Sequence, residues 1–186
     1  ALIGLAITAV VGMMIEGTAN YEIQFRAAID GRSLLCGHQI DGIGESKASA
    51  TLVDFRFMVS NVELIRYDGK IFPLALEQDG IWQIGKVANL DFEDASGSCV
   101  QGTPATRREV RGSAPKGNYR GVRFVLGGPD GMNLADPAIA PLFNAGWMQS
   151  EVEGNYHAMR IELDTVAVVE GAARPASQAA RTVFRI

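Results

Sequence analysis

The sequence predicts an all-β fold, an antiparallel β-sandwich or open barrel with short helical turns. Short segments alternate apolar and polar residues and are separated by turn dipeptides, which is the pattern of half-buried strands. Helical signals are few, and Pro137 and Pro141 limit the best helical candidate, residues 136–148, to short turns. With 186 residues, of which 47% are hydrophobic and 20% charged, the chain has the size and composition of one globular domain.

The alternating segments follow one another along most of the chain. In order they are residues 21–31, 53–70, 70–76, 117–129, 157–171 and 181–186. The alternation changes phase near Ser60 and Asn61, which predicts a β-bulge or a bend. Asp68-Gly69 predicts a hairpin turn into the following strand.

In the segment at 117–129, four apolar or aromatic residues are candidates for the core. They are Tyr119, Val122, Phe124 and Leu126. No repeat or linker divides the chain, so residues 20–186 are expected to form a single domain.

The N-terminus is different in kind. Residues 1–15 form an uninterrupted apolar run that is shorter than the about 20 residues of a membrane span. Its length, and the small residues from Gly17 to Ala19, are typical of a secretory signal, so we expect residues 1–19 to be a signal whose first residues precede this sequence. The alternative is a retained apolar anchor or assembly segment, and membrane contact is expected only in that case. Export predicts a periplasmic, cell-surface or secreted protein.

The net charge is −4 and no run of Lys or Arg stands out, so we expect no nucleic-acid partner. Cys36 and Cys99 are the only cysteines. In an oxidising compartment such a pair favours one disulfide, closing a loop of about 60 residues and contributing about 4 kcal/mol. Two thiolate metal ligands are the alternative, which is weaker because neither cysteine has CxxC spacing.

Only two histidines, His38 and His157, are available for chemistry. This number excludes a three-histidine zinc site within one chain, and no HExxH, GxSxG or phosphate-binding glycine motif is present. Carboxylates in "DFED" and "EVEG" leave a glycosidase pair as a weak alternative. Two imidazoles and a softer third ligand would suit copper. The candidates for the third ligand are Met58, Met148, Met159 or a modified aromatic residue.

Five segments carry a resemblance to a known family. They are "LLCGHQIDGIG", "VDFRFMVSNVELI", "LEQDGIWQIGKVANLDFEDASGSCVQGTPAT", "VRGSAPKGNYRGVRFVLGGP" and "GNYHAMRIELD". In this order they resemble the MbnP-like family, also described as metallo-mystery-pair proteins. The family includes surface copper binders of methane-oxidising bacteria of the CorA and MopE type. The resemblance covers most of the chain from residue 25 to residue 164.

The resemblance implies an exported, β-rich copper protein that is a substrate of a partner and not itself an enzyme. The partner is a di-haem, MauG-like peroxidase that converts a tryptophan to kynurenine, which then joins histidines at one copper ion. Trp82 matches that tryptophan, and His157 lies about where relatives place a histidine. Cys36 and Cys99 match two of the family's cysteines, which favours the disulfide.

Some relatives carry a second histidine two residues after the modified tryptophan, where this chain has Ile84. Either His38 supplies that imidazole or the copper site is degenerate. Trp147 is a rival target for oxidation. The leading hypothesis is copper acquisition, storage or delivery through His38, His157 and Trp82. The alternatives are a structural or assembly subunit anchored by its N-terminus, with a vestigial metal site, and a calcium site in the "DFEDASG" turn.

Overall fold

The computed structural model describes residues 17–29, 31–43, 45, 47–129, 157–166 and 180–185. These residues form antiparallel strands joined by turns, and none of the described residues is helical. The prediction of an all-β sandwich is therefore confirmed. The predicted helical turns at residues 136–148, most of the apolar N-terminus and Trp147 lie outside the described residues.

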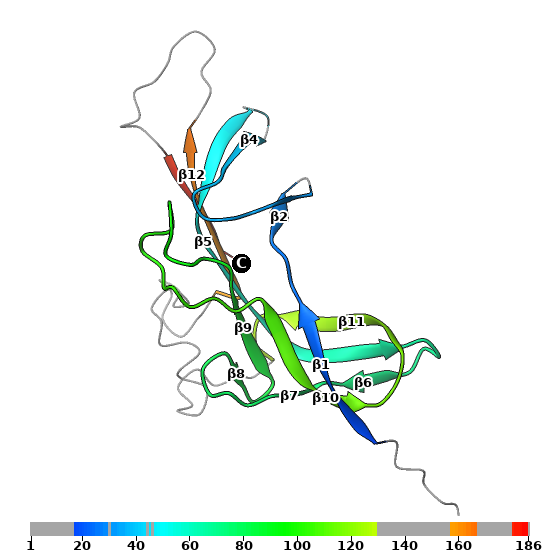
Figure 1. The fold of residues 1–186 in the computed structure, drawn as a ribbon. Helices are drawn as coiled ribbons and strands as arrows, with labels where there is room; N and C mark the ends of the chain where they lie inside the picture. Colours follow the sequence, from blue (N-terminus) through cyan, green and yellow to red (C-terminus); the bar gives the residue numbers. More distant parts are fainter. Residues whose placement is uncertain are drawn as a thin grey trace, which may run out of the picture.

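One long strand, β5 (Ala48–Arg66), organises the larger sheet (Figure 1). The strands along one side of it are β4 (Gln39–Ile43), β9 (Val87–Asp91) and β6 (Ile71–Pro73). The strands along its other side are β12 (Met159–Val166) and β11 (Tyr119–Leu126). Two outer strands complete the sheet, β13 (Ala180–Arg185) beside β12 and β8 (Gln83–Ile84) beside β9.

A smaller sheet packs over the C-terminal half of β5 (Figure 1). Its strands in spatial order are β1 (Thr18–Gln24), β10 (Glu109–Pro115) and β7 (Ala75–Leu76). A short hairpin follows β1, made of β2 (Ala28–Ile29) and β3 (Arg32–Ser33). The hydrophobic core lies between the sheets, because the same apolar cluster contains Val110 and Ala114 of β10 and Val59 and Leu64 of β5.

The phase change in the sequence of β5 corresponds to a real irregularity. Asn61 has a positive φ of 49°, and the register between β5 and β11 shifts at the neighbouring residues. The bulge predicted at Ser60-Asn61 is therefore confirmed. After it, Val62 and Leu64 face the core, as Val59 does before it.

Strand β11 differs from the expectation that its apolar residues fill the core. Val122, Phe124 and Leu126 are 38%, 37% and 39% exposed, and the prediction that they are core residues is wrong. Among the described strands β11 pairs with β5 alone, so it lies at an edge of the described sheet. Tyr119 does reach the core cluster, where its ring packs edge-on against Tyr21.

Cys36 and Cys99 form a disulfide, as the sequence predicted. It fastens the loop before β4 to the loop after β9, and Cys99 is fully buried. Beside it Gly97, with φ +53°, lies against the backbone of Gly37 so closely that a Cβ would collide with it. Only glycine fits this crossing of the two loops.

Candidate functional site

The larger sheet has two unlike faces at its centre. Residues of β5 that point to the core alternate with residues that point to the opposite face, because successive side chains of a strand point to opposite sides. The second face is buried yet largely polar. It carries Asp54, Arg56, Met58 and Ser60 from β5, Asn89 and Asp91 from β9, and Arg160 and Glu162 from β12. We call this surface the polar face.

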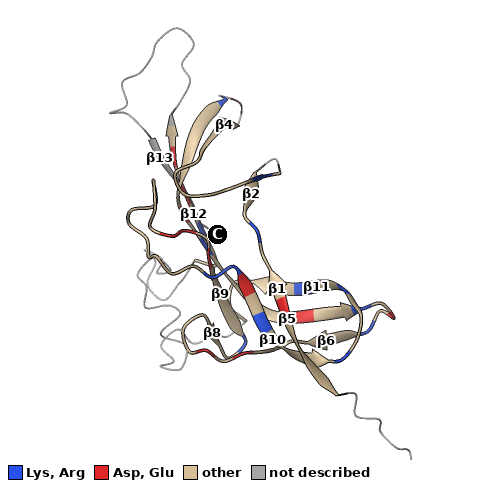
Figure 2. Cartoon of the chain, viewed as in Figure 1, with Lys and Arg blue, Asp and Glu red and all other residues tan. Residues whose placement is uncertain are grey.

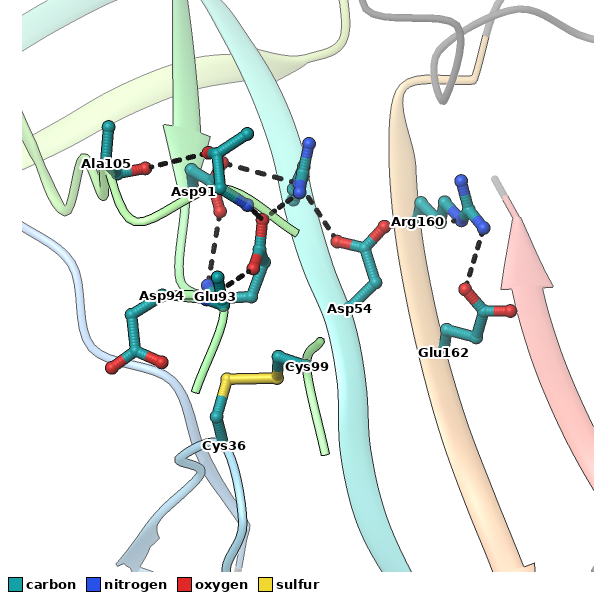
Figure 3. A network of polar contacts seen from close by, with 12 residues as sticks. Cys36, Asp54, Asp91, Glu93, Asp94, Cys99, Ala105, Arg160 and Glu162 are labelled. Atoms are coloured by element: carbon teal, nitrogen blue, oxygen red, sulfur yellow. Dashed lines mark hydrogen bonds and ion pairs between the residues drawn. A yellow bond between two sulfur atoms is a disulfide. The ribbon is translucent and has the colours of Figure 1, made fainter. Parts of the chain in front are cut away.

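Arg56 lies at the centre of a charged network on the polar face. Figure 3 shows its acidic partners Asp54, Asp91 and Glu93. Its guanidinium is 3.0 Å from Asp54 Oδ1 and 3.4 Å from Asp91 Oδ2, and it donates to Glu93 Oε1. Glu93 is fully buried, and it also accepts the backbone N–H of Thr103 at 2.9 Å. The network thus ties the acidic turn after β9 to β5.

Burial dominates the acid–base properties of this network. It raises the pKa of Asp91 to about 7, because the loss of hydration outweighs the attraction of Arg56. Repulsion from the carboxylate of Asp54 raises the pKa of Asp91 further. Burial also raises the pKa of Asp54, against the attraction of Arg56 and Arg160. On β12 a second ion pair joins Arg160 to Glu162 at 2.7 Å (Figure 3).

The carboxylates of "DFED" have structural roles in these contacts. Asp91 and Glu93 pair with Arg56, and Asp94 accepts the hydroxyl and backbone N–H of Ser96 at 2.5 and 3.1 Å. Within the described part of the chain, no three His, Cys, Asp or Glu residues are placed to hold a metal ion together. The calcium and glycosidase alternatives therefore gain no support from the described acids.

A different part of the polar face brings two predicted site residues to one row of the sheet. Trp82 accepts a 2.7 Å backbone hydrogen bond from Asn89, continuing the register of β8 with β9. Asn89 lies opposite Met58, whose backbone N–H donates to Ala158 at 2.9 Å. The row therefore runs from Trp82 through Asn89 and Met58 to Ala158, and His157 is the next residue. Because directly opposite residues share a face, Met58 and Asn89 both belong to the polar face, and the backbone of Trp82 lies at the end of their row in the bend before β8.

His38 lies elsewhere. Cys36 bridges to Leu52 and Gln39 pairs with Thr51, which puts His38 near the level of Leu52 on β5. The stretch of β5 from Leu52 to Met58 corresponds to about 20 Å of extended strand. The side chain of His38 is exposed, whereas His157 and Trp82 are half-buried.

Met58 is the least expected residue of the row. It is fully buried, yet it does not belong to the apolar cluster between the sheets. Its neighbours on the same face are Ser60 along the strand and Asn89 across it. Ser60 Oγ and Asn89 Oδ1 are both buried without a hydrogen-bond partner. Buried polar atoms are nearly always paired, so these two oxygens are exceptions on this face.

The candidate ligands predicted from the sequence carry donor atoms that suit copper. Imidazole nitrogen and thioether sulfur are ligands that copper accepts, and thioether favours Cu(I). Among the other sequence candidates, Met159 pairs with Phe57 and so faces the core, while Met148 lies outside the described residues. Sequence reasoning missed Ser60 and Asn89. Their signal was polar residues at alternate positions in strands otherwise rich in apolar residues.

In the described part of the chain, Lys and Arg do not gather on one strand. They are spread over several strands and mixed with Asp and Glu (Figure 2). The described residues contain no helix long and apolar enough to cross a membrane.

Comparisons with known proteins agree with this architecture. The family model named MbnP matches residues 18–177. The solved structure of MbnP from Methylosinus trichosporium superimposes with a TM-score of 0.67 at 26% sequence identity, over 91% of this chain and 62% of that protein. The chain thus spans less than two-thirds of the length of that protein. No curated protein sequence matches this chain. Since the family model covers most of its length, the chain belongs to the MbnP family.

Proposed function

We propose that the chain is an exported copper-binding protein, not itself an enzyme, that serves copper acquisition, storage or delivery in the periplasm or at the cell surface. It holds one copper ion over the row that joins Trp82 to His157. Membership of the MbnP family supports a copper-related role. The single observation that supports the location is that the backbones of Trp82 and of Ala158, the neighbour of His157, lie at the two ends of one row across β9 and β5.

Trp82 binds the ion after its oxidation to kynurenine. The indole has an N–H donor but no good lone pair for a metal, whereas kynurenine offers an aryl amine and a carbonyl. The backbone of Trp82 is held at both ends. Its backbone N–H donates to the carboxylate of Asp79 at 2.7 Å, and its backbone carbonyl accepts the N–H of Asn89. A fixed backbone suits a residue that must keep its side chain at a metal. A MauG-like di-haem peroxidase would catalyse this oxidation.

His38 provides the matched control for the ligand role of His157. Replacing His157 with Ala should abolish tight binding of copper by the full chain, with the fold intact by circular dichroism. Replacing His38 with Ala should leave the copper content unchanged if the row alone forms the site. Copper content that depends on His38 but not on His157 would move the site to the loop beside the disulfide.

The modification has its own test. Replacing Trp82 with Phe should remove the kynurenine absorbance of protein isolated with its partner enzyme and weaken copper binding. Survival of the chromophore in that variant would transfer the modification to Trp147.

A further inference from the structure

We propose that a cavity between the larger sheet and the β2–β3 hairpin binds a small aromatic anion. The cavity has a volume of about 430 Å³, and its lining includes Phe25, Arg26, Phe55 and Phe57. Small-ligand sites are typically cavities of about 300–1,000 Å³ with apolar walls and few polar groups. The cavity lies on the core face of β5, opposite the polar face, so the proposal is independent of the copper site.

The cavity exists because a short hairpin covers this part of the sheet. β1 runs on into the β2–β3 hairpin, whose strands pair with each other and with no other described strand (Figure 1). The hairpin contributes Ala27 and Leu34 to the apolar cluster, and both are buried. It leaves Phe25, Phe55 and Phe57 only half-buried. An apolar ligand would therefore remove further aromatic surface from water.

The aromatic rings of the lining favour an aromatic ligand. The ring of Phe92 is nearly parallel to that of Phe57, at 5.6 Å and 9°, and to that of Phe55, at 4.9 Å and 23°. Phe25 stands edge-on to Phe57 at 5.9 Å and 72°. Aromatic rings attract one another in both the stacked and the edge-on arrangement, so a further ring in the cavity would find partners of both kinds.

The charge of the lining favours an anion. Arg26 is the one charged side chain among the described residues that line the cavity, and it is exposed. It makes no ion pair with any of the described acids. A guanidinium at the rim of an apolar cavity is suited to pair with a carboxylate or sulfonate while the rings hold the rest of the ligand.

The test uses the full chain and two fluorescent probes with the same aromatic rings. Anilinonaphthalene sulfonate carries an anionic group, whereas phenylnaphthylamine carries none. We expect saturable binding of one molecule of either probe per chain, with the tighter binding for the sulfonate. Arg26→Gln should weaken binding of the sulfonate about threefold, as the loss of an exposed ion pair predicts, and leave phenylnaphthylamine unchanged.

Arg32→Gln is the matched control, because Arg32 is exposed on the same hairpin but does not line the cavity. It should bind both probes as the wild type does. Ala28→Trp should block both probes without unfolding the chain, because Ala28 lines the cavity and is itself exposed.

Three results would each overturn the proposal. They are a wild-type chain that binds neither probe, binding that survives Ala28→Trp, and equal affinities of wild type and Arg26→Gln for the sulfonate. Circular dichroism of each variant checks that the fold persists. Copper content should be the same in all of these variants, so the outcome here leaves the test of the proposed function separate.

Discussion

Replacing Arg56 with methionine tests the charged network of the polar face. The side chain of Arg56 is 8% exposed, and those of its partners Asp54, Asp91 and Glu93 are 11%, 3% and 0% exposed. Removing one member of a buried ion pair leaves an uncompensated charge and costs about 3–5 kcal/mol. We therefore expect the free energy of unfolding to fall by about that amount at pH 8.

The loss of stability caused by Arg56→Met should be larger at high pH than at low pH. Because the pKa of Asp91 is raised to about 7 from an unfolded value near 4, the folded state binds more protons between these pH values. Stability therefore falls as pH rises through this window. Without Arg56 the carboxylates become harder to ionise, and at pH 5 they take up protons. The loss at pH 5 should then be smaller than at pH 8 by roughly 1 kcal/mol or more.

Urea unfolding of both proteins at pH 5 and pH 8, followed by circular dichroism, measures these differences. Arg123→Met is the matched control, because Arg123 pairs with Glu63 at 2.6 Å on the surface and its side chain is 57% exposed. Its effect should stay below about 1 kcal/mol. The reasoning is refuted if Arg56→Met also loses less than about 1 kcal/mol at pH 8, or if its loss is the same at both pH values.

Three further predictions concern the same region. Replacing Cys36 and Cys99 with Ala should lower the free energy of unfolding by about 4 kcal/mol, since the bridge spans 63 residues; a loss below about 1 kcal/mol in urea unfolding would contradict it. Asp91→Asn should flatten the pH dependence of the melting temperature between pH 4 and pH 7. An unchanged slope would mean that other groups cause this pH dependence. Gly102→Ala should destabilise by about 1–3 kcal/mol in urea unfolding, because a Cβ there overlaps the buried carboxylate of Glu93. Gly121→Ala should not, because a Cβ there would make only ordinary van der Waals contact with Ile65; equal effects would refute this.

Local patterns in the sequence predicted much of the fold. Alternation predicted most of β5, and the phase change located its bulge at Asn61. The presence of only two cysteines, in a chain expected to be exported, predicted the disulfide. The exposed position of β11 could not be predicted, because alternation reports two unlike faces but not whether a second sheet covers either of them.

The candidate site was only partly accessible from sequence. The resemblance pointed to Trp82 and His157, but nothing in the sequence places the backbones of Trp82 and of Ala158, the neighbour of His157, at the ends of one row of the sheet. That relation depends on the long-range pairing of β9 and β12 with β5. The same pairing separates Met58 from Met159, which are equivalent as candidates in the sequence. It also sets His38 apart from the row.

We propose that oxidised Trp82 and His157 hold one copper ion. Native mass spectrometry of the protein isolated from its own host, followed by fragmentation, is the decisive measurement, because one spectrum reports bound metal, the N-terminus and any change of mass at Trp82. We expect one copper ion per chain, a kynurenine mass at Trp82 and a chain that starts near Asn20. A metal-free chain that retains Ala1, with both Trp82 and Trp147 unmodified, would refute the proposed copper site.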